Sequence, residues 1–318
     1  MKLLTIPELA AKLLENDNYI MLTHRRPDGD TVGSAAALCR GLRAIGKRAA
    51  VLENPQFTEK YRPYVEGLTV DRVPEDAVLV SVDVASAKML SFSAEDYVNQ
   101  ITFFVDHHGL SRDFGTQGVV EPSAAACGEI VLDLLRQMQV PLDKKTAEAL
   151  YCAISTDTGC FRYSNVTART LRAAADCKEL GADTFAINQV MFMTKRLARL
   201  KLDAYLTQST EFYADGLVSV STIPETLQQE LGITEDDIDD ISGFGREIAG
   251  VEIAVMLRQV SEGGKISLRT SPRFDAAELC RKLGGGGHKA AAGATISGGV
   301  EAAKEAILRV IAESGVAL

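Results

Sequence analysis

Short apolar runs alternate with helical patterns through the first third of the chain. The runs predict buried strands at residues 19–23, 48–53, 77–83 and 101–106. Between the first two runs, residues 32–45 have the 3.6-residue spacing of apolar side chains that is typical of a helix. Strands that alternate with helices predict an α/β fold, in which a parallel sheet carries helices on both faces.

The pattern changes twice further along the chain. Helical patterns dominate from residue 124 to about residue 208, and short strands then mix with short helices. We therefore predict a first domain at residues 1–190, a basic helical linker at residues 191–209 and a smaller α/β domain at residues 210–318.

Composition narrows the possible partners. The 318 residues are 46% hydrophobic and carry a formal net charge of −9, which opposes tight binding to long duplex nucleic acid. Small phosphorylated substrates remain possible.

No apolar run reaches membrane-spanning length. Glu8 and Glu15 indicate that the N-terminus is an amphipathic helix rather than a signal peptide. The six cysteines form no CxxC pair, which favours reduced core residues in a cytoplasmic protein.

All four histidines fall inside motifs that suggest metal or phosphate chemistry: HRRPDGD, VDHHG and GGGGHKAAAG. The first two motifs, and the aspartate of VSVDVAS, each follow a predicted strand, so we expect them at one edge of the sheet. A further aspartate lies in STDTGCFRYSN, after a helical stretch. The candidate metal ligands are His24, Asp28, Asp30, Asp83, His107 and Asp157.

Six such ligands are enough for two divalent ions if one carboxylate bridges them. A mixed histidine and carboxylate set suits Mn²⁺, and the lack of nearby cysteine argues against structural zinc. The alternative is that single aspartates at strand ends are turn residues or helix caps. Asp30 in particular could cap the helix that starts near Val32.

The third histidine motif suggests a second site. Gly284 to Gly287 could present backbone N–H groups to an anion beside His288. Residues 265–271 alternate as a strand, which places Arg269 and Ser271 on one face. The alternatives are a flexible glycine linker and a solvated arginine. The candidate substrate-binding residues are Arg258, Arg269, Ser271, Gly286, Gly287 and His288.

The order of these motifs resembles a known family. HRRPDGDTVGS, VSVDVAS, VDHHG and STDTGCFRYSN look like the four successive motifs of the DHH phosphoesterases, and CRKLGGGGHKAAAGA resembles the glycine-rich signature of the DHH-associated substrate domain. The likeness spans nearly the whole chain. It is greatest to the bacterial nanoRNase and 3′-phosphoadenosine-5′-phosphate phosphatase group.

The resemblance implies specific roles. His24, Asp28 and Asp83 would hold one Mn²⁺, while Asp30, Asp83, His107 and Asp157 would hold another, with Asp83 bridging. His108 would face the scissile phosphate, and Asp106 is expected beside it as a second catalytic residue.

The implied activity is hydrolysis of short RNA oligonucleotides to mononucleotides, and of 3′-phosphoadenosine-5′-phosphate to AMP, in a cleft between the domains. Linear or cyclic dinucleotides are alternative substrates, and a nonenzymatic nucleotide sensor is an alternative of another class. We expect no membrane partner, and a homodimer is possible.

Overall fold

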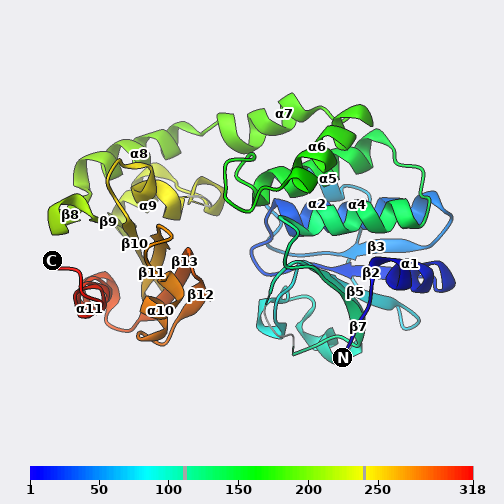
Figure 1. Ribbon diagram of the computed structural model, residues 1–318, viewed down its shortest axis with the longest axis horizontal. Helices are drawn as coiled ribbons and strands as arrows, with labels where there is room; N and C mark the ends of the chain where they lie inside the picture. The colour runs from blue at the N-terminus through cyan, green and yellow to red at the C-terminus, as the bar shows by residue number, and fades with distance from the viewer. Residues whose placement is uncertain (110–112, 239–240, 318) are drawn as a thin grey trace. The chain divides into compact units, whose positions relative to one another are not determined.

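The computed structural model describes residues 1–109, 113–238 and 241–317. The chain divides into two compact units, Met1–Thr194 and Lys195–Leu318 (Figure 1). No helix in the described residues is both long and apolar enough to cross a bilayer.

The first unit is built on a seven-stranded parallel sheet, as the alternating pattern predicts. Its strands, in spatial order, are β1 (Lys2–Leu3), β7 (Gln117–Val120), β6 (Ile101–Asp106), β5 (Val78–Val82), β2 (Tyr19–Leu22), β3 (Ala49–Leu52) and β4 (Thr69–Val70). The chain runs outward from β2 to β4 and then returns to β5 on the other side of β2. This change of direction is a topological switch point, where α/β sheets form their sites.

The helices α1 (Ile6–Glu15), α2 (Gly29–Ala44) and α4 (Cys127–Gln137) lie on one face of this sheet, and α5 (Lys144–Asp157) and α6 (Ala168–Glu179) pack on the far side of α2 and α4 (Figure 1). Glycines in α2 let the helices approach closely. A Cβ atom at Gly33 would lie 2.3 Å from the Ala149 carbonyl oxygen of α5. On the opposite face, Leu90 and Ala94 pack on the sheet beside the 3₁₀ helices η1 (Ala87–Met89) and η2 (Glu95–Gln100). The prediction of helices on both faces is confirmed.

The first unit also contains short helical segments that the sequence pattern does not resolve. The short helix α3 (Arg62–Val65) lies between β3 and β4. After α6 come α7 (Thr184–Asn188) and one π-helical segment, Gln189–Met193. π-Helical segments are rare and are often found at functional sites, which makes Gln189–Met193 a segment of interest.

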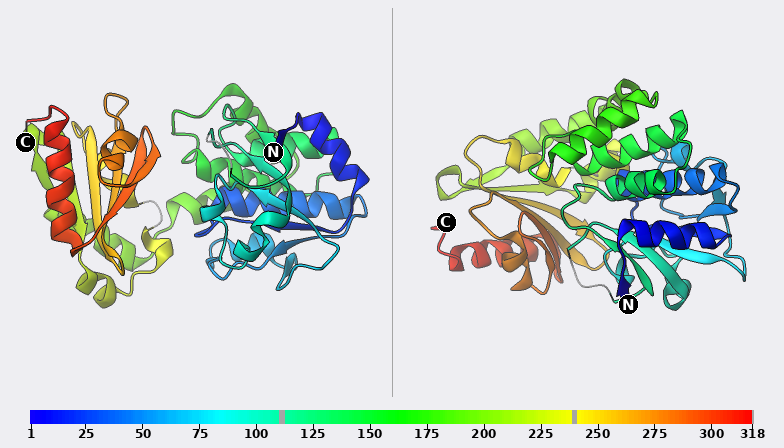
Figure 2. Two further views of the ribbon diagram at one scale, coloured as in Figure 1. Left: turned by 90° about the horizontal axis from the view of Figure 1, so that it is seen from below. Right: turned by 45° about the vertical axis from the view of Figure 1, so that its right-hand side comes forward.

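The second unit contains a mixed six-stranded sheet. Its spatial order is β12 (Gly286–His288), β13 (Ala291–Ile296), β11 (Gly263–Thr270), β10 (Ile253–Val260), β9 (Val218–Ile223) and β8 (Glu211–Tyr213). Only the β9–β10 pair is parallel. The helices α10 (Ala276–Arg281) and α11 (Gly299–Glu313) pack apolar side chains on one face of this sheet, and Figure 2 shows the ribbon of α11 beside the strands.

Two further helices belong to the second unit, α8 (Leu197–Ser209) and α9 (Glu225–Leu231). Leu202 and Leu206 of α8 are fully buried and pack against Ile223 and Met256 of the sheet. This packing fixes α8 to the sheet of the second unit.

Candidate active site

Three neighbouring strands deliver candidate ligands to one edge of the first sheet. His24 lies just beyond β2, Asp83 directly follows β5, and His107 directly follows β6. Since β2, β5 and β6 are adjacent and parallel, their carboxyl ends meet at the switch point. The structure therefore brings together residues that are up to 83 positions apart in sequence.

Two helices bring the remaining candidates to the same edge. Asp28 and Asp30 lie at the start of α2, and Asp157 is the last residue of α5. The two ends touch, because a Cβ atom at Gly29 would lie 2.3 Å from the Thr156 hydroxyl oxygen. All six predicted ligands are thus gathered at one place.

The first group of ligands surrounds His24. Its Nε2 atom lies 3.5 Å from Asp28 Oδ1 and 3.7 Å from Asp83 Oδ2. One ligand atom from each of these residues lies within 4.8 Å of the other two, so the three could hold a metal ion.

The second group surrounds His107. Its Nε2 atom lies 3.4 Å from Asp83 Oδ1, 3.7 Å from Asp30 Oδ2 and 3.6 Å from Asp157 Oδ2. The two oxygens of Asp83 therefore face different groups. This is the geometry expected of a carboxylate that bridges two ions.

The spacing of these atoms fits divalent cations. Two ligand atoms about 2.1 Å from one ion lie about 3.0 Å apart at an angle of about 90° and about 3.6 Å apart at about 120°. Direct hydrogen bonds would be shorter, about 2.9 Å. Asp83 Oδ1 is also buried without a hydrogen-bond partner among the described residues. A cation between the side chains would remove the cost of that unpaired oxygen.

Both histidines are oriented by backbone carbonyls. The Nδ1–H group of His24 donates to the Arg25 carbonyl oxygen at 2.7 Å, and that of His107 donates to the Ala124 carbonyl oxygen at 3.2 Å. Because a carbonyl can only accept, each Nδ1 atom keeps its proton, and Nε2 is the nitrogen that faces the carboxylates and could bind an ion once it loses its own proton.

The helix cap at α2 is Asp28 rather than Asp30. Asp28 Oδ1 accepts hydrogen bonds from the backbone N–H groups of Asp30 and Thr31 at 3.0 and 3.1 Å. The alternative in which Asp30 caps this helix is wrong, because the helix begins at Gly29 and Asp30 already lies within its first turn.

Asp30 instead caps a different helix. Its carboxylate accepts from the backbone N–H groups of Cys127 and Gly128, at 2.6 and 3.0 Å, where α4 begins without a side-chain cap of its own. Ser34 Oγ donates to it as well, at 3.0 Å. Asp30 is therefore held in place by the fold, independently of any ion.

The electrostatics of the cluster favour a cation. Burial raises the pKa of Asp30 well above its usual value, and the charges of Asp83 and Asp157 raise it further. Burial likewise raises the pKa of Asp157 to about 7. Burial alone would lower the pKa of His24, but the carboxylates of Asp28 and Asp83 outweigh it and raise the value to about 10. Ionising all these carboxylates together is therefore costly, and a bound cation would offset that cost.

The backbone is strained around these residues. Asp83 has φ 58°, and three consecutive residues after Asp157 are also left-handed: Gly159, Cys160 and Phe161 have φ 55°, 57° and 63°. Positive φ is costly for residues other than glycine, and such strain concentrates at functional sites.

His108 and Asp106 form a pair beside the cluster. His108 Nδ1 lies 2.7 Å from Asp106 Oδ1, and Asp106 is fully buried at the end of β6. His108 is half-buried, and its Nδ1 atom is 3.5 Å from Asp83 Oδ1. The pair holds the His108 ring beside the metal-ligand candidates.

Sequence reasoning missed two supporting amides. Asn54 is fully buried, and its Nδ2 atom donates to the His24 carbonyl oxygen at 2.9 Å. Asn165 Nδ2 donates to the carbonyl oxygens of Ala125 and Asp157, both at 3.1 Å. Asn165 therefore ties the end of α5 to the segment that orients His107. Asn165 could have been suspected because it ends the STDTGCFRYSN motif, whereas Asn54 lies outside every motif.

Strand register gathers the cationic candidates of the second unit. Arg258 pairs with Lys265 across β10 and β11, Arg269 pairs with Ala291 across β11 and β13, and His288 also pairs with Ala291 across β12 and β13. Paired residues share a face, and so do residues two apart on one strand. All four polar side chains therefore lie on one sheet face, which we call the cationic face: Arg258, Lys265, Arg269 and His288.

Neighbouring contacts distinguish the candidates on this face. Arg258 Nη1 lies 3.3 Å from Glu235 Oε1. Ser271 lies one residue beyond β11, and its hydroxyl group donates to Glu252 Oε2 at 3.1 Å. Arg269 and His288 are separated by one strand, so their Cα atoms are about 10 Å apart.

Part of the glycine run is a strand. Gly286 to His288 form edge strand β12, so this part of the run is not a flexible linker. Packing explains two of the glycines. A Cβ atom at Gly285 would lie 2.2 Å from the Gly293 carbonyl oxygen, and one at Gly287 would lie 2.5 Å from the Ala291 carbonyl oxygen. Gly286 has nothing within 4 Å of its Cβ position. Intramolecular packing therefore does not explain Gly286.

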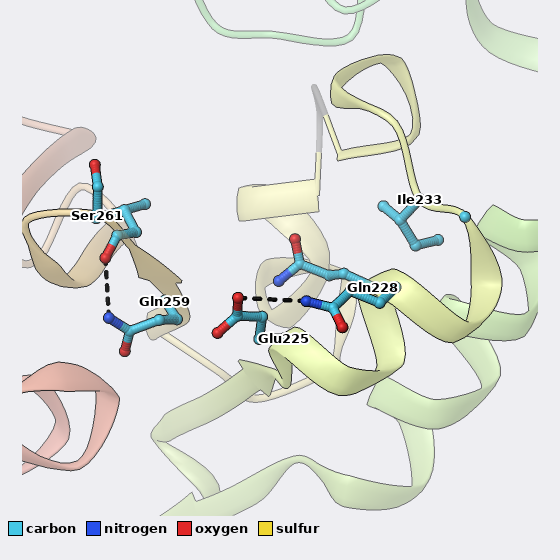
Figure 3. Close-up of a pocket in the computed structure, with 8 residues that line it drawn as sticks. Glu225, Gln228, Ile233, Gln259 and Ser261 are labelled. Carbon is cyan, nitrogen blue, oxygen red and sulfur yellow. Dashed lines mark hydrogen bonds between the residues drawn. The ribbon is translucent and has the colours of Figure 1, made fainter.

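A cleft of about 660 Å³ also lies in the second unit (Figure 3). Its side chains offer amide, carboxylate and hydroxyl groups. They come from Glu225, Gln228, Gln229, Gly232, Ile233, Gln259, Val260 and Ser261. None of the predicted substrate residues lines it.

Comparison with known proteins now decides the family. Residues 18–154 match the model of the DHH family, N-terminal domain, and residues 217–314 match that of the DHHA1 domain. The chain is 34% identical over 307 residues to the bifunctional oligoribonuclease and PAP phosphatase NrnA of Thermus thermophilus, covering 95% of this chain and 91% of the relative. The chain belongs to the DHH family. The resemblance seen in the motifs is confirmed.

This DHH-family chain is also similar to two more distant proteins, one in sequence and one in fold. It is 26% identical to the cyclic-di-AMP phosphodiesterase PdeA of Listeria monocytogenes, covering 87% of this chain but 44% of that protein. An exopolyphosphatase-related protein from Bacteroides fragilis has the same fold, with a TM-score of 0.84, 23% identity, and coverage of 97% of this chain and 96% of that structure.

Proposed function

We propose that this protein is a phosphoesterase, dependent on two Mn²⁺ ions, that degrades short RNA oligonucleotides to mononucleotides and converts 3′-phosphoadenosine-5′-phosphate to AMP. The observation that carries the proposal is the pair of three-ligand groups, His24–Asp28–Asp83 and Asp30–His107–Asp157, which Asp83 joins because its second oxygen lies 3.4 Å from His107 Nε2. The 34% identity to an oligoribonuclease and PAP phosphatase supports the choice of substrates.

The ligand roles follow from the two groups. His24, Asp28 and Asp83 would hold one ion, and Asp30, Asp83, His107 and Asp157 would hold the other. A metal pair of this kind supplies an activated water and neutralises charge on a phosphate. Oxygen and imidazole ligands without sulfur suit Mn²⁺.

His108 has a separate role. Its Nδ1–H group donates to Asp106 at 2.7 Å, which fixes the ring next to Asp83. We assign His108 to contact the scissile phosphate and Asp106 to hold that ring in place.

The cationic face has the chemistry to hold a phosphate that is not being cleaved. Arg269 offers paired N–H donors and His288 a further donor, beside the backbone of Gly286 and Gly287. Arg258 and Ser271 complete the proposed set, although each already has an acidic neighbour.

The decisive experiment is a substrate panel assayed with Mn²⁺: RNAs of two to about 24 nucleotides labelled at the 5′ end, 3′-phosphoadenosine-5′-phosphate, linear and cyclic dinucleotides, and pyrophosphate. With a net charge of −9, efficiency should fall steeply beyond about five nucleotides, because longer strands gain no basic track. Equal efficiency on a dinucleotide and on a long RNA would contradict the proposal.

A second candidate is a phosphodiesterase for dinucleotides, favoured by the 26% identity to a cyclic-di-AMP phosphodiesterase. Preferential cleavage of cyclic or linear dinucleotides in the panel would select it. Binding of all ligands without turnover would instead point to a nonenzymatic sensor.

A further inference from the structure

A second cavity lies within the first unit, away from the proposed metal cluster. It has a volume of about 290 Å³ and is lined in part by Arg40 and Lys145. Arg40 is near the end of α2 and Lys145 near the start of α5, so both lie at the helix ends opposite to Asp30 and Asp157. At 1.5 Å per residue, Arg40 is about 15 Å along α2 from Asp30.

Three cations line this cavity: Arg40, Lys60 and Lys145. Arg40 Nη2 donates to the Tyr64 carbonyl oxygen at 3.2 Å, but its Nε atom is buried and has no hydrogen-bond partner among the described residues. A buried N–H donor without an acceptor is destabilising. The geometry therefore calls for an acceptor from outside the chain.

Two carboxylates, those of Glu148 and Asp183, also line the cavity, and both are already engaged. Glu148 accepts from the Asp183 N–H group at 3.4 Å and lies 3.6 Å from Lys144 Nζ. Asp183 accepts from the Ala186 N–H group at 3.1 Å, as the cap of α7. Asp143, whose pKa the Arg40 charge helps to lower, accepts from Thr146. The carboxylates are thus committed to local structure.

The rest of the lining is largely apolar. It consists of Pro63 and Tyr64 at α3, and of Ala186, Ile187, Val190 and Met191 in α7 and the π-helix. The volume is at the low end of the range for ligand pockets, which is about 300–1,000 Å³. A ligand that fills it is therefore small, with one anionic group and one apolar body about the size of an aromatic ring.

We propose that this cavity is a binding site for small organic anions, in which a phosphate, phosphonate or carboxylate group meets Arg40 and Lys145 while an apolar ring lies against Tyr64 and Met191. The site is separate from the proposed metal cluster. Its occupant contacts α7 and the π-helix, and the Asn188 amide at the end of α7 donates to the Tyr151 hydroxyl of α5 at 3.0 Å. Binding therefore reduces local opening of residues 186–193.

The test uses phenylphosphonate, which combines the two chemical features and has no phosphate ester bond to hydrolyse. Calorimetric titration into the Mn²⁺-treated protein should show binding at this cavity, and inorganic phosphate and benzyl alcohol, as separate halves, should bind more weakly. Lys145→Gln should lower the affinity about tenfold, the loss of one charge-assisted hydrogen bond. Lys178→Gln is the control, because Lys178 is an exposed lysine of the same unit that does not line the cavity. It should change affinity less than about twofold.

Hydrogen exchange gives an independent readout. Phenylphosphonate should slow amide exchange in residues 186–193 in the wild type and not in Lys145→Gln. Arg40→Gln should weaken binding further. If that variant fails to fold, the two lysine variants still decide, since both lysines are exposed. Equal effects of the two lysine variants, or no change in exchange at residues 186–193, would overturn the proposal.

Discussion

The two proposed sites are built in opposite ways. In the first unit, a buried and mostly acidic cluster collects side chains from three strand ends and two helix ends, and other groups hold those side chains in place. In the second unit, the cationic face is half-buried to exposed, and strand register alone places its members together.

This difference indicates a division of labour. A site that activates water gains from ligands that are already in position, because no reorganisation is then needed during the reaction. A site that grips a distant phosphate can tolerate adjustable side chains, since it supplies binding energy and orientation. The predictions below test whether the two sites can be separated.

The largest effect should follow Asp83→Ala. A bridging carboxylate serves both ions, so turnover with Mn²⁺ should fall about a thousandfold and the bound metal should decrease. Rates and metal content by plasma mass spectrometry measure this. Asp76→Ala, at an exposed aspartate outside the cluster, is the control. A rate within about tenfold of wild type would remove Asp83 from the bridging role.

Metal affinity should rise with pH. In the metal-free protein, the pKa of Asp157 is raised by burial to about 7. Burial would lower the pKa of His107, but the carboxylates of Asp83 and Asp30 raise it to about 11. An ion must displace these protons, so affinity should increase about tenfold per pH unit for each proton released, and protons should appear on binding. Calorimetry between pH 6 and 8 in two buffers checks this; no proton release would contradict it.

The cationic face should be separable from the chemistry. Arg269→Ala and His288→Ala should each lower kcat/KM on nucleotides about 10- to 100-fold, from the loss of about 1.5–3 kcal/mol of charge-assisted hydrogen bonding. Bis-p-nitrophenyl phosphate has no second phosphate, so its hydrolysis should change little, and bound metal should stay constant. Equal damage to both substrates would place His288 in the catalytic cluster.

Asn165→Ala should act on both substrates alike. Its amide holds the end of α5 against the segment that orients His107, so its loss should weaken Mn²⁺ binding about tenfold. Raising the Mn²⁺ concentration should restore most of the activity. If excess Mn²⁺ restored nothing, Asn165 would have a role other than positioning.

The smallest effects distinguish two adjacent glycines. Gly287 has φ 146° and packs against β13, so Gly287→Ala should destabilise the protein by about 1–3 kcal/mol. Gly286 has open space around its Cβ position, so Gly286→Ala should leave thermal unfolding unchanged while lowering nucleotide affinity a few-fold. An unchanged affinity would argue against a phosphate at Gly286.

The cluster was predictable because its chemistry and its topology agree. Histidines and aspartates stand directly after apolar runs, and parallel strands bring such positions to one edge. The second role of Asp30 was not predictable. Its partners Cys127 and Gly128 are 97 and 98 residues away, and no local pattern reports a helix cap supplied from another helix.

The second unit was harder to predict in detail. Glycine has low strand propensity, so β12 was not predicted as a strand. Which residues face Arg269 depends on the register with β13, and alternation within one strand cannot give it. The π-helix at Gln189–Met193 likewise has no simple sequence period.

The left-handed backbone at Asp83 limits which residues evolution or an engineer can place there. Aspartate and asparagine adopt this conformation more readily than longer or branched residues do, and of these two only aspartate carries the charge that two cations require. Asp28 has φ −99° and Asp157 is helical, so their backbones would accept many residues. Position 83 should therefore tolerate the fewest replacements in a saturation library, and glutamate should fail there because of the chain's shape as well as its reach.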